Sequence, residues 1–319
     1  MKKISWNIRD VFFSLSIFCG SQNFMDDAPL PQTTVLIRIS CNILFMDPLL
    51  FERLAQAVEE AVWEAEIILP PDVEAVLRLA AGRETNPVAR GEFANIPENL
   101  SQARDLRVPI CQDTGIPVVY LTVPPEVPVT AELYEAVAAG VRRATLSVPL
   151  RPNGVDPISR ENSGDNTGAG LPPVHVVPGD VLRVTVLPKG AGSENMSQIR
   201  MMLPSEVLDI PRFVVDVVMA AGARPCPPVV VGVGIGGTFD GAAALAKEAL
   251  LERIDVMDAY EQGICDAINA LGIGPMGLGG DTTALAVKVK RGFCHTASLP
   301  VAVNIQCWCC RRGVREVAL

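Results

Sequence analysis

Three cysteines lie far apart in the sequence, and each is next to a segment that is expected to be a strand. Cys111 begins CQDTG, Cys226 stands between two prolines in ARPCPPVVV, and Cys307 follows the apolar run LPVAVNIQ. Thiolates at three such positions could hold an iron–sulfur cluster and leave one iron open to act as a Lewis acid. The C-x-x-C-x-x-C spacing of electron-transfer clusters is absent. Spacing alone therefore favours the simpler interpretation, in which the three thiols are small buried side chains.

Polar groups near these cysteines add to the candidate chemistry. Gln112 and Asp113 directly follow Cys111, which places an amide and a carboxylate on the same loop as that thiol. The segment KGAGSEN at 189–195 combines free backbone N–H groups with Lys189, so it could bind a carboxylate or a phosphate. A plain turn at the start of a helix explains that spacing equally well.

A second glycine pattern resembles the fingerprint of a dinucleotide-binding loop. Gly232, Gly234 and Gly237 stand in G-x-G-x-x-G register between an apolar run and a helical segment. In a nicotinamide or flavin enzyme, these glycines let a pyrophosphate approach the helix N-terminus, and a strand ending in an acid follows. The next segment, 251–271, has helical periodicity instead. A structural or substrate-binding turn is therefore favoured over an NAD-dependent oxidoreductase.

Composition excludes several classes of protein. The chain has 319 residues and a formal net charge of −9, and it has no long basic run that would hold nucleic acid. Its nine cysteines match no secreted disulfide framework, which indicates a reducing compartment and a cytoplasmic location. Only two histidines are present, so a histidine-rich zinc site is nearly excluded. Apolar residues make up 49% of the chain, and we expect some of them to cover a partner subunit.

The first 45 residues differ from the rest of the chain. A basic start and an apolar run of about ten residues outline a signal peptide, but that run is too short to cross a bilayer. Arg9 and Asp10 directly precede the run, and no small-x-small cleavage site follows it. We interpret residues 1–45 as an atypical extension that need not be native, with an export or targeting signal as the alternative. Residues 46–319 are then expected to form a single catalytic domain.

The rest of the sequence predicts an α+β fold. Apolar residues recur at helical spacing from Asp47 to about Leu69, Asp72 is expected to cap a second helix, and 97–106 is expected to form a third. Further strands are predicted at 116–123, 181–190, 227–237, 283–290 and 299–306, with helices at 130–144, 240–251 and 251–271. This pattern describes a helical N-terminal part followed by a mixed sheet with surrounding helices. The long polar segment 151–170 is of a kind that is usually functional or disordered.

Five motifs in a fixed order resemble the α subunit of class I iron–sulfur fumarate hydratases and of the related L-tartrate dehydratases. They are ICQDTGIPVVY at 110–120, LPKGAGSENMSQIRMMLPSE at 187–206, CPPVVVGVGIGGTFD at 226–240, GIGPMGLGGDTTALAVKVK at 272–290 and HTASLPVAVNIQCWCCRRG at 295–313. The resemblance extends from about Met46 to Arg312. Several motifs in the same order make it specific.

The resemblance implies a [4Fe–4S] cluster held by Cys111, Cys226 and Cys307. In such enzymes the open iron polarises the hydroxyl or water of the substrate, while acid–base groups move a proton at the adjacent carbon. Cys309 and Cys310 have no counterpart in this ligand set, and we expect them to be bystanders.

The resemblance also implies a set of substrate-binding residues. Gln112 and Asp113 would lie at the substrate, with Asp113 transferring or orienting a proton. Arg151, in PLRPNG, resembles an arginine that clamps a substrate carboxylate, a role for which a guanidinium is well suited. Gly190 and Gly192 would supply backbone contacts.

The implied function is the reversible hydration of fumarate to (S)-malate, with dehydration of L-tartrate to oxaloacetate as the close alternative. The resemblance gives no place to the swivelling β/α domain of the family, which carries a catalytic threonine and further basic residues. A separate β subunit is therefore expected, in an (αβ)2 assembly that binds a small dicarboxylate. Asp281 departs from the family pattern, because a basic residue is expected at its position.

Overall fold

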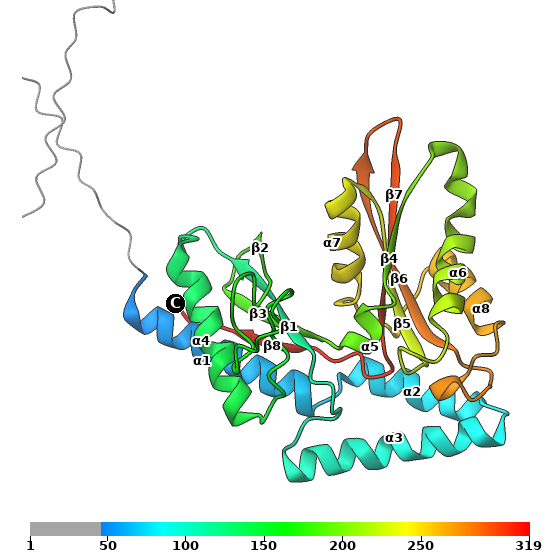
Figure 1. The fold of residues 1–319 in the computed structure, drawn as a ribbon, viewed down its shortest axis with the longest axis horizontal. Helices are drawn as coiled ribbons and strands as arrows, with labels where there is room; N and C mark the ends of the chain where they lie inside the picture. The colour runs from blue at the N-terminus through cyan, green and yellow to red at the C-terminus, as the bar shows by residue number, and fades with distance from the viewer. Residues whose placement is uncertain (1–45) are drawn as a thin grey trace, which may run out of the picture. The chain divides into compact units, whose positions relative to one another are not determined.

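The computed structural model describes residues 46–319, so the interpretation of residues 1–45 lies outside the described part of the chain. The predicted α+β fold class is confirmed, and the strands divide between two four-stranded sheets (Figure 1). The strand order is β2–β1–β3–β8 in the first sheet and β4–β7–β5–β6 in the second. Both sheets mix parallel and antiparallel pairs.

The first sheet packs against two long helices. Its strands are β2 (Val174–Pro178), β1 (Ile116–Val123), β3 (Arg183–Lys189) and β8 (Gly313–Glu316). Helices α1 (Pro48–Ile67) and α4 (Ala131–Ser147) share its apolar core. The helix α1 starts where the sequence predicts, because the Asp47 carboxylate accepts the Leu49 N–H at 3.0 Å and Pro48 fits the first helical position.

The second sheet is covered on both faces. Its strands are β4 (Gln198–Met202), β7 (Leu299–Gln306), β5 (Val229–Gly237) and β6 (Ala284–Cys294). Helix α7 (Phe239–Ala249) packs on one face, while α6 (Ile210–Ala221) and α8 (Ala259–Asn269) share the core on the other (Figure 1). Burial on both faces explains why β5 and β7 read as continuous apolar runs rather than alternating ones.

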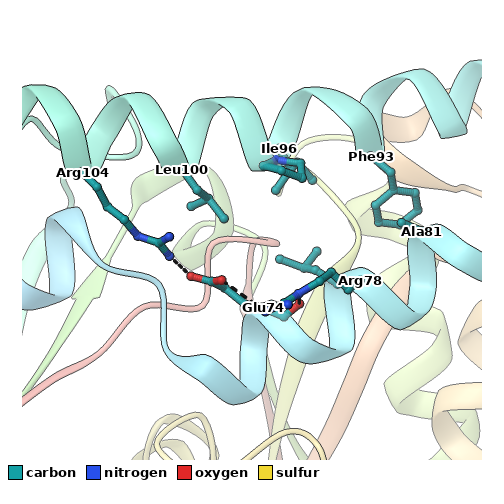
Figure 2. A pocket seen from close by; sticks show the side chains of 9 residues that line it. Glu74, Arg78, Ala81, Phe93, Ile96, Leu100 and Arg104 are labelled. Carbon is teal, nitrogen blue, oxygen red and sulfur yellow. Dashed lines mark hydrogen bonds and ion pairs between the residues drawn. The ribbon is translucent and has the colours of Figure 1, made fainter.

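Helices α2 (Pro71–Arg83) and α3 (Pro87–Leu106) lie side by side. A cavity of about 280 Å³ separates them, with Phe93 and Leu100 on its apolar side and Glu74 paired with Arg78 and Arg104 (Figure 2). The cavity contains none of the candidate site residues.

Three helix starts differ from the prediction, and one of them is the helix expected from 251, which begins at Ala259 because the Asp258 side chain caps it. Asp72 does not cap α2, since that helix begins at Pro71 and the Asp72 carboxylate instead accepts the Ile254 N–H at 3.0 Å. The third helix starts at Pro87, ten residues before 97–106, because the Asn86 side chain accepts backbone N–H groups of its first turn.

Some elements have no clear signal in the sequence. These are α6, the short strands β2, β4 and β8, and the 3-10 turns at Pro204–Asp209 and Pro275–Gly277. The short helix α5 (Ala191–Glu194) follows the turn at 189–190, where the sequence indicates a helix start. The chain crosses from one sheet to the other twice, and both crossings lie at the candidate site. It leaves β3 through α5 to reach β4, and it leaves β7 through residues 307–312 to reach β8 (Figure 1).

Candidate active site

The segments that carry the three candidate cysteines come near one another by the passages between the two sheets. Cys111 begins the CQDTG loop (111–115) between α3 and β1, Cys226 precedes β5, and Cys307 follows β7. The N–H of Trp308 donates to the carbonyl oxygen of Cys226 at 3.3 Å, which joins two of these segments. Burial raises the pKa of Cys226 and of Cys307, and the nearby thiol of Cys111 raises both pKa values further. Cys111 therefore lies within electrostatic reach of the other two.

Cys226 has an unusual backbone conformation. Its φ is +52°, in the left-handed region that side chains other than glycine rarely adopt, and Pro225 and Pro227 flank it. Strain of this kind costs on the order of 1–3 kcal/mol and collects at functional sites. Its side chain is exposed, and Cys111 and Cys307 are half-buried. A group bound at this place could reach all three thiols.

Cys309 and Cys310 lie in the apolar core instead. Both are buried with the residues that α2 and α3 cover. Burial raises the pKa of Cys310 to about 12 and the pKa of Cys309 well above its ordinary value. Their burial in this core sets them apart from the exposed Cys226, and their role as bystanders stays a prediction.

Asp113 is fixed by contacts on several sides. Its Oδ1 accepts the Gly115 N–H at 3.0 Å, and its carbonyl oxygen accepts Nη2 of Arg311 at 2.7 Å. A Cβ added to Gly190 would lie 2.8 Å from Oδ2 of Asp113, so only glycine fits at this position without displacing the carboxylate. The CQDTG loop and the start of α5 thus form one surface.

A cavity of about 380 Å³ opens at this surface. It is lined by Asp113, Gly115, Ile116, Val118, Asn153, Pro173, Lys189, Ala191, Glu194, Asn195 and Lys247. Gln112 is exposed beside Asp113 and does not line the cavity. Gly192 is also exposed outside it, and a Cβ there would lie 3.3 Å from the carbonyl oxygen of Arg224, close to Cys226 in the sequence.

Arg151 is exposed, and its backbone is held against the CQDTG loop. The Arg151 N–H donates to Oγ1 of Thr114 at 3.1 Å, and its carbonyl oxygen accepts Nδ2 of Asn166 at 3.0 Å. Asn153 also joins the loop, because its Nδ2 donates to the Gly115 carbonyl oxygen at 3.0 Å. Thr114 belongs to the CQDTG motif that the sequence singles out, whereas the only sequence signal for Asn153 and Asn166 is their place in the long polar segment 151–170.

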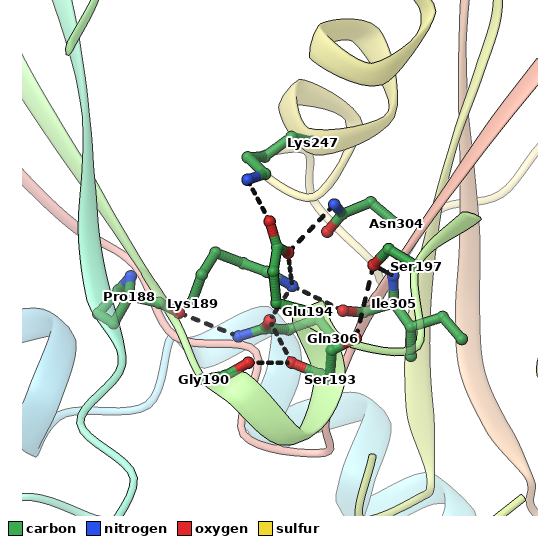
Figure 3. A network of polar contacts seen from close by, with 10 residues as sticks. All are labelled: Pro188, Lys189, Gly190, Ser193, Glu194, Ser197, Lys247, Asn304, Ile305 and Gln306. Atoms are coloured by element: carbon green, nitrogen blue, oxygen red, sulfur yellow. Dashed lines mark hydrogen bonds and ion pairs between the residues drawn. The ribbon is translucent and has the colours of Figure 1, made fainter. Parts of the chain in front are cut away.

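A polar network is built around the buried side chain of Lys189 (Figure 3), and Lys189, Glu194 and Lys247 of this network also line the cavity. Nζ of Lys189 donates to the carbonyl oxygen of Ile305 at 2.6 Å and to Oε1 of Gln306 at 2.8 Å, and it lies 3.3 Å from Oε2 of Glu194. Glu194 also pairs with Lys247. The Lys189 ammonium is therefore engaged by β7 and α5, and the binding of a carboxylate or phosphate by the backbone N–H groups of 189–195 stays a prediction.

The charged groups of this network shift the pKa values of their neighbours. Burial lowers the pKa of Lys189, while Glu194 partly restores it. Burial would raise the pKa of Glu194, but Lys189 and Lys247 together hold it below its ordinary value. The carboxylate is thus kept ionised between two ammonium groups, and it fastens the first sheet to the second.

A second buried ion pair lies on the other side of Asp113. Nη1 of Arg311 is 3.0 Å from Oε2 of Glu66, and the two side chains are 2% and 0% exposed. Burial raises the pKa of Glu66 to about 7, although Arg311 opposes this and Asp113 adds to it. Burial disfavours the charge of Arg311, but Glu66 and the nearby thiols, first that of Cys309, raise its pKa above the ordinary value. Sequence reasoning missed both residues, because single charged residues normally indicate a solvated surface.

Asp281 has a structural partner that accounts for its acidity. Its Oδ2 accepts the N–H of Thr85 at 2.9 Å and the hydroxyl of Thr85 at 2.6 Å. Glu84, which is buried, accepts the Asp281 N–H at 3.0 Å. The two carboxylates fasten the GLGGDTT segment to the start of α3, a contact that a basic side chain at 281 could not make.

The G-x-G-x-x-G glycines serve helix packing. A Cβ on Gly232 or Gly234 would lie 2.1 Å from a backbone carbonyl oxygen of α7, that of Ala246 or Ala242. Glycine is required here because α7 rests directly on β5, and the helix occupies the space above the strand. This supports the structural interpretation of the pattern.

Among residues 46–319, no helix is both long enough and apolar enough to cross a membrane.

The family model described as fumarate hydratase (Fumerase) matches residues 55–316. A Methanocaldococcus jannaschii protein named "Putative L(+)-tartrate dehydratase subunit alpha" is 42% identical over 280 residues, which cover 84% of this chain and 98% of that protein. The L(+)-tartrate dehydratase subunit alpha of Escherichia coli K12 is 32% identical over 255 residues, which cover 77% of this chain and 84% of that protein.

Proposed function

This chain belongs to the fumarate hydratase family of hydro-lyases, as an α-type subunit, and we propose that it hydrates fumarate reversibly to (S)-malate with a separate β subunit. The observation that carries the proposal is the meeting of Cys111, Cys226 and Cys307 beside Asp113, from segments far apart in the chain. A thiol cluster next to a fixed carboxylate is suited to a metal-assisted proton transfer.

The thiols fit an iron–sulfur cluster better than a single ion. Among the described residues, no three His, Cys, Asp or Glu side chains are placed to hold one metal ion. A [4Fe–4S] cluster binds each cysteine at a different iron, so its ligands need not converge on one point. The buried Nε of Arg311, four residues after Cys307, has no hydrogen-bond acceptor within residues 46–319, as expected beside an absent acceptor group. When bound, the cluster supplies a Lewis-acidic iron for the substrate hydroxyl or water.

The residues of this chain then bind the dicarboxylate and move the proton. Arg151 clamps one substrate carboxylate through its planar guanidinium, and Gln112 with the backbone of Gly190 and Gly192 orients the rest. Asp113 holds or transfers the proton at the carbon next to the one that carries the hydroxyl. Oδ1 of Asp113 accepts the Gly115 N–H, and Oδ2 lies next to Gly190.

L-tartrate dehydration to oxaloacetate is the second candidate activity. It is favoured by the names of the two relatives, "Putative L(+)-tartrate dehydratase subunit alpha" and "L(+)-tartrate dehydratase subunit alpha". Fumarate hydration and tartrate dehydration both act on four-carbon dicarboxylates with the leaving or entering hydroxyl next to a carboxylate, so the same side chains serve either. We further propose an (αβ)2 assembly in the cytoplasm, where thiols stay reduced.

The test is anaerobic reconstitution of the αβ complex followed by iron analysis, visible absorption and turnover. We expect brown, iron-containing protein that converts malate, tartrate or both. Replacing Cys111, Cys226 or Cys307 by Ser should remove the colour and most of the iron.

Cys294→Ser is the matched control, because Cys294 is an exposed cysteine at the end of β6. This variant should keep its iron and its activity. A colourless wild-type complex would refute the cluster, and inactivity on both diacids would refute both candidate reactions.

A further inference from the structure

Arg311 connects the C-terminal passage between the sheets to the CQDTG loop. It lies in the segment 307–312 that joins β7 to β8 (Figure 1). Its Nη2 donates to the carbonyl oxygen of Asp113 at 2.7 Å, and its own backbone N–H donates to the Cys309 carbonyl oxygen at 3.0 Å. One side chain thus fixes the loop that carries Cys111 to the segment that carries Cys307.

The guanidinium has donor capacity that no described residue uses. Nε is buried without a hydrogen-bond acceptor, and Nη1 faces Glu66 at 3.0 Å without hydrogen-bond alignment. A buried donor left without an acceptor destabilises the folded state. Such a cost is sustained where a ligand completes the site, and sulfur atoms of cysteine thiolates and clusters accept N–H donors.

Glu66 keeps this cation in place from the opposite side. Its carbonyl oxygen at the end of α1 accepts the Ile110 N–H at 2.8 Å, one residue before Cys111. Its carboxylate is wholly buried and pairs with Arg311. The loop is therefore held by the backbone of Glu66 and, through Arg311, by its side chain.

We propose that Arg311 is a positioning residue of the cluster site: it supplies an N–H donor and a positive charge to the thiolate-ligated cluster while it fixes the backbone of Asp113. The inference rests on the proposed function, because it requires the cluster. Glu66 is its counter-charge and sets how much of the positive charge the cluster experiences.

The sign of the effect follows from electrostatics. Adding an electron to a cluster makes it more negative, so a nearby cation stabilises the reduced form and raises the midpoint potential, and a nearby carboxylate lowers it. Removing Arg311 should therefore lower the potential, while removing the charge of Glu66 should raise it. A purely structural ion pair predicts no such opposition, because breaking it from either side would only loosen the fold.

The test uses the reconstituted αβ complex at about pH 8.5, well above the pKa of about 7 of Glu66. Arg311→Gln should lower the midpoint potential, measured by a spectroscopically monitored redox titration, and weaken cluster retention roughly ten- to hundredfold. Glu66→Gln should raise the potential. Should Arg311→Gln not fold, Arg311→Lys keeps the charge but lacks the planar fork, and it should weaken retention by a smaller factor.

Arg312→Gln is the matched control. Arg312 is the next residue and pairs with Asp72 at 2.7 Å, so this variant loses an ion pair of its own but should keep the wild-type potential. Wild-type potential and retention in the folded Arg311 variant, or shifts of equal sign for the Arg311 and Glu66 variants, would overturn the inference alone. A wild-type complex that takes up no iron overturns the proposed function, and the inference with it.

Discussion

The side-chain amide of Asn166 donates a hydrogen bond of 3.0 Å to the carbonyl oxygen of Arg151. The same amide donates to Oγ1 of Thr145 at 3.2 Å, and its oxygen accepts the N–H groups of Asn153 at 2.6 Å and Gly154 at 3.3 Å. Asn166 is fully buried, and both ends of its carboxamide are used. This one side chain therefore holds the backbone on which the proposed substrate-binding arginine stands.

Asn166→Ala should weaken substrate binding more than it slows the chemical step. Loss of the carboxamide frees the Arg151 segment, so we expect KM for the dicarboxylate to rise roughly tenfold, about 1.4 kcal/mol of binding free energy, with a smaller change in kcat. Steady-state kinetics of the reconstituted complex measures both. Ser159→Ala, at an exposed position in the same loop, is the control and should behave as wild type. A lower kcat at unchanged KM would contradict this role.

The position of Lys189 predicts a large loss of stability when its charge is removed. Lys189→Met removes the ammonium that donates to the Ile305 carbonyl oxygen and to Oε1 of Gln306, which keeps only a 3.4 Å bond from the Ser193 hydroxyl. It also leaves Glu194 short of one cation. We expect the free energy of unfolding to fall by about 3–5 kcal/mol in urea titrations.

Lys290→Met provides the comparison for that measurement. Lys290 pairs with Glu248 at 2.7 Å, but both side chains are partly exposed, and such pairs contribute at most about 1 kcal/mol. Equal losses for the two lysine variants would show that the Lys189 network adds nothing beyond a surface ion pair.

Glu66 should make stability depend on pH in an unusual direction. Its pKa in the folded protein is about 7, above the ordinary 4.5, so the folded state keeps the proton longer than the unfolded state does. Stability from this group is complete below pH 4.5 and is lost as the pH rises to 7. Relative to Glu66→Gln, the wild-type free energy of unfolding should fall by up to about 3 kcal/mol across that window. A difference that rises with pH would refute the buried, proton-retaining state of Glu66.

Two glycines allow a matched test of helix packing. Gly234→Ala would place its Cβ 2.1 Å from the Ala242 carbonyl oxygen, and we expect a loss of at least about 3 kcal/mol because backbone, not a flexible side chain, is in the way. Gly263→Ala, in the exposed part of α8, meets no atom within 4 Å and should gain about 0.5–1 kcal/mol. Thermal unfolding of both variants checks the opposite signs, and tolerance of Gly234→Ala would mean that α7 can move away from β5.

The sequence predicts those parts of the molecule that depend on periodicity and local caps. The strand at 116–123 was placed from its β-branched run, and the first helix from Asp47 and Pro48. The positions of the cysteines and of Asp113 beside predicted strands single them out, while their roles and that of Arg151 come from the resemblance.

Contacts between distant residues could not be predicted in this way. Glu66 and Arg311 are 245 positions apart, and Thr85 and Asp281 are 196 apart. A charged residue that will be buried looks the same in sequence as one that will be solvated, since only its remote partner distinguishes the two. The same holds for Asp72. Its carboxylate accepts the N–H of the distant Ile254 instead of capping the helix, as its local sequence would favour.

The pairing of β3 with β8 has a consequence for the order of folding. Arg183 lies opposite Glu316 in that pair, 133 residues later, and the entire second sheet lies between them in sequence. Closing so long a loop in an unfolded chain is entropically costly and slow. If the second sheet forms first, it brings the ends of the loop close together before the pair has to meet. We therefore expect the first sheet to gain its last strand late, and amide protons of β8 to gain protection after those of β5 and β7 in a refolding experiment.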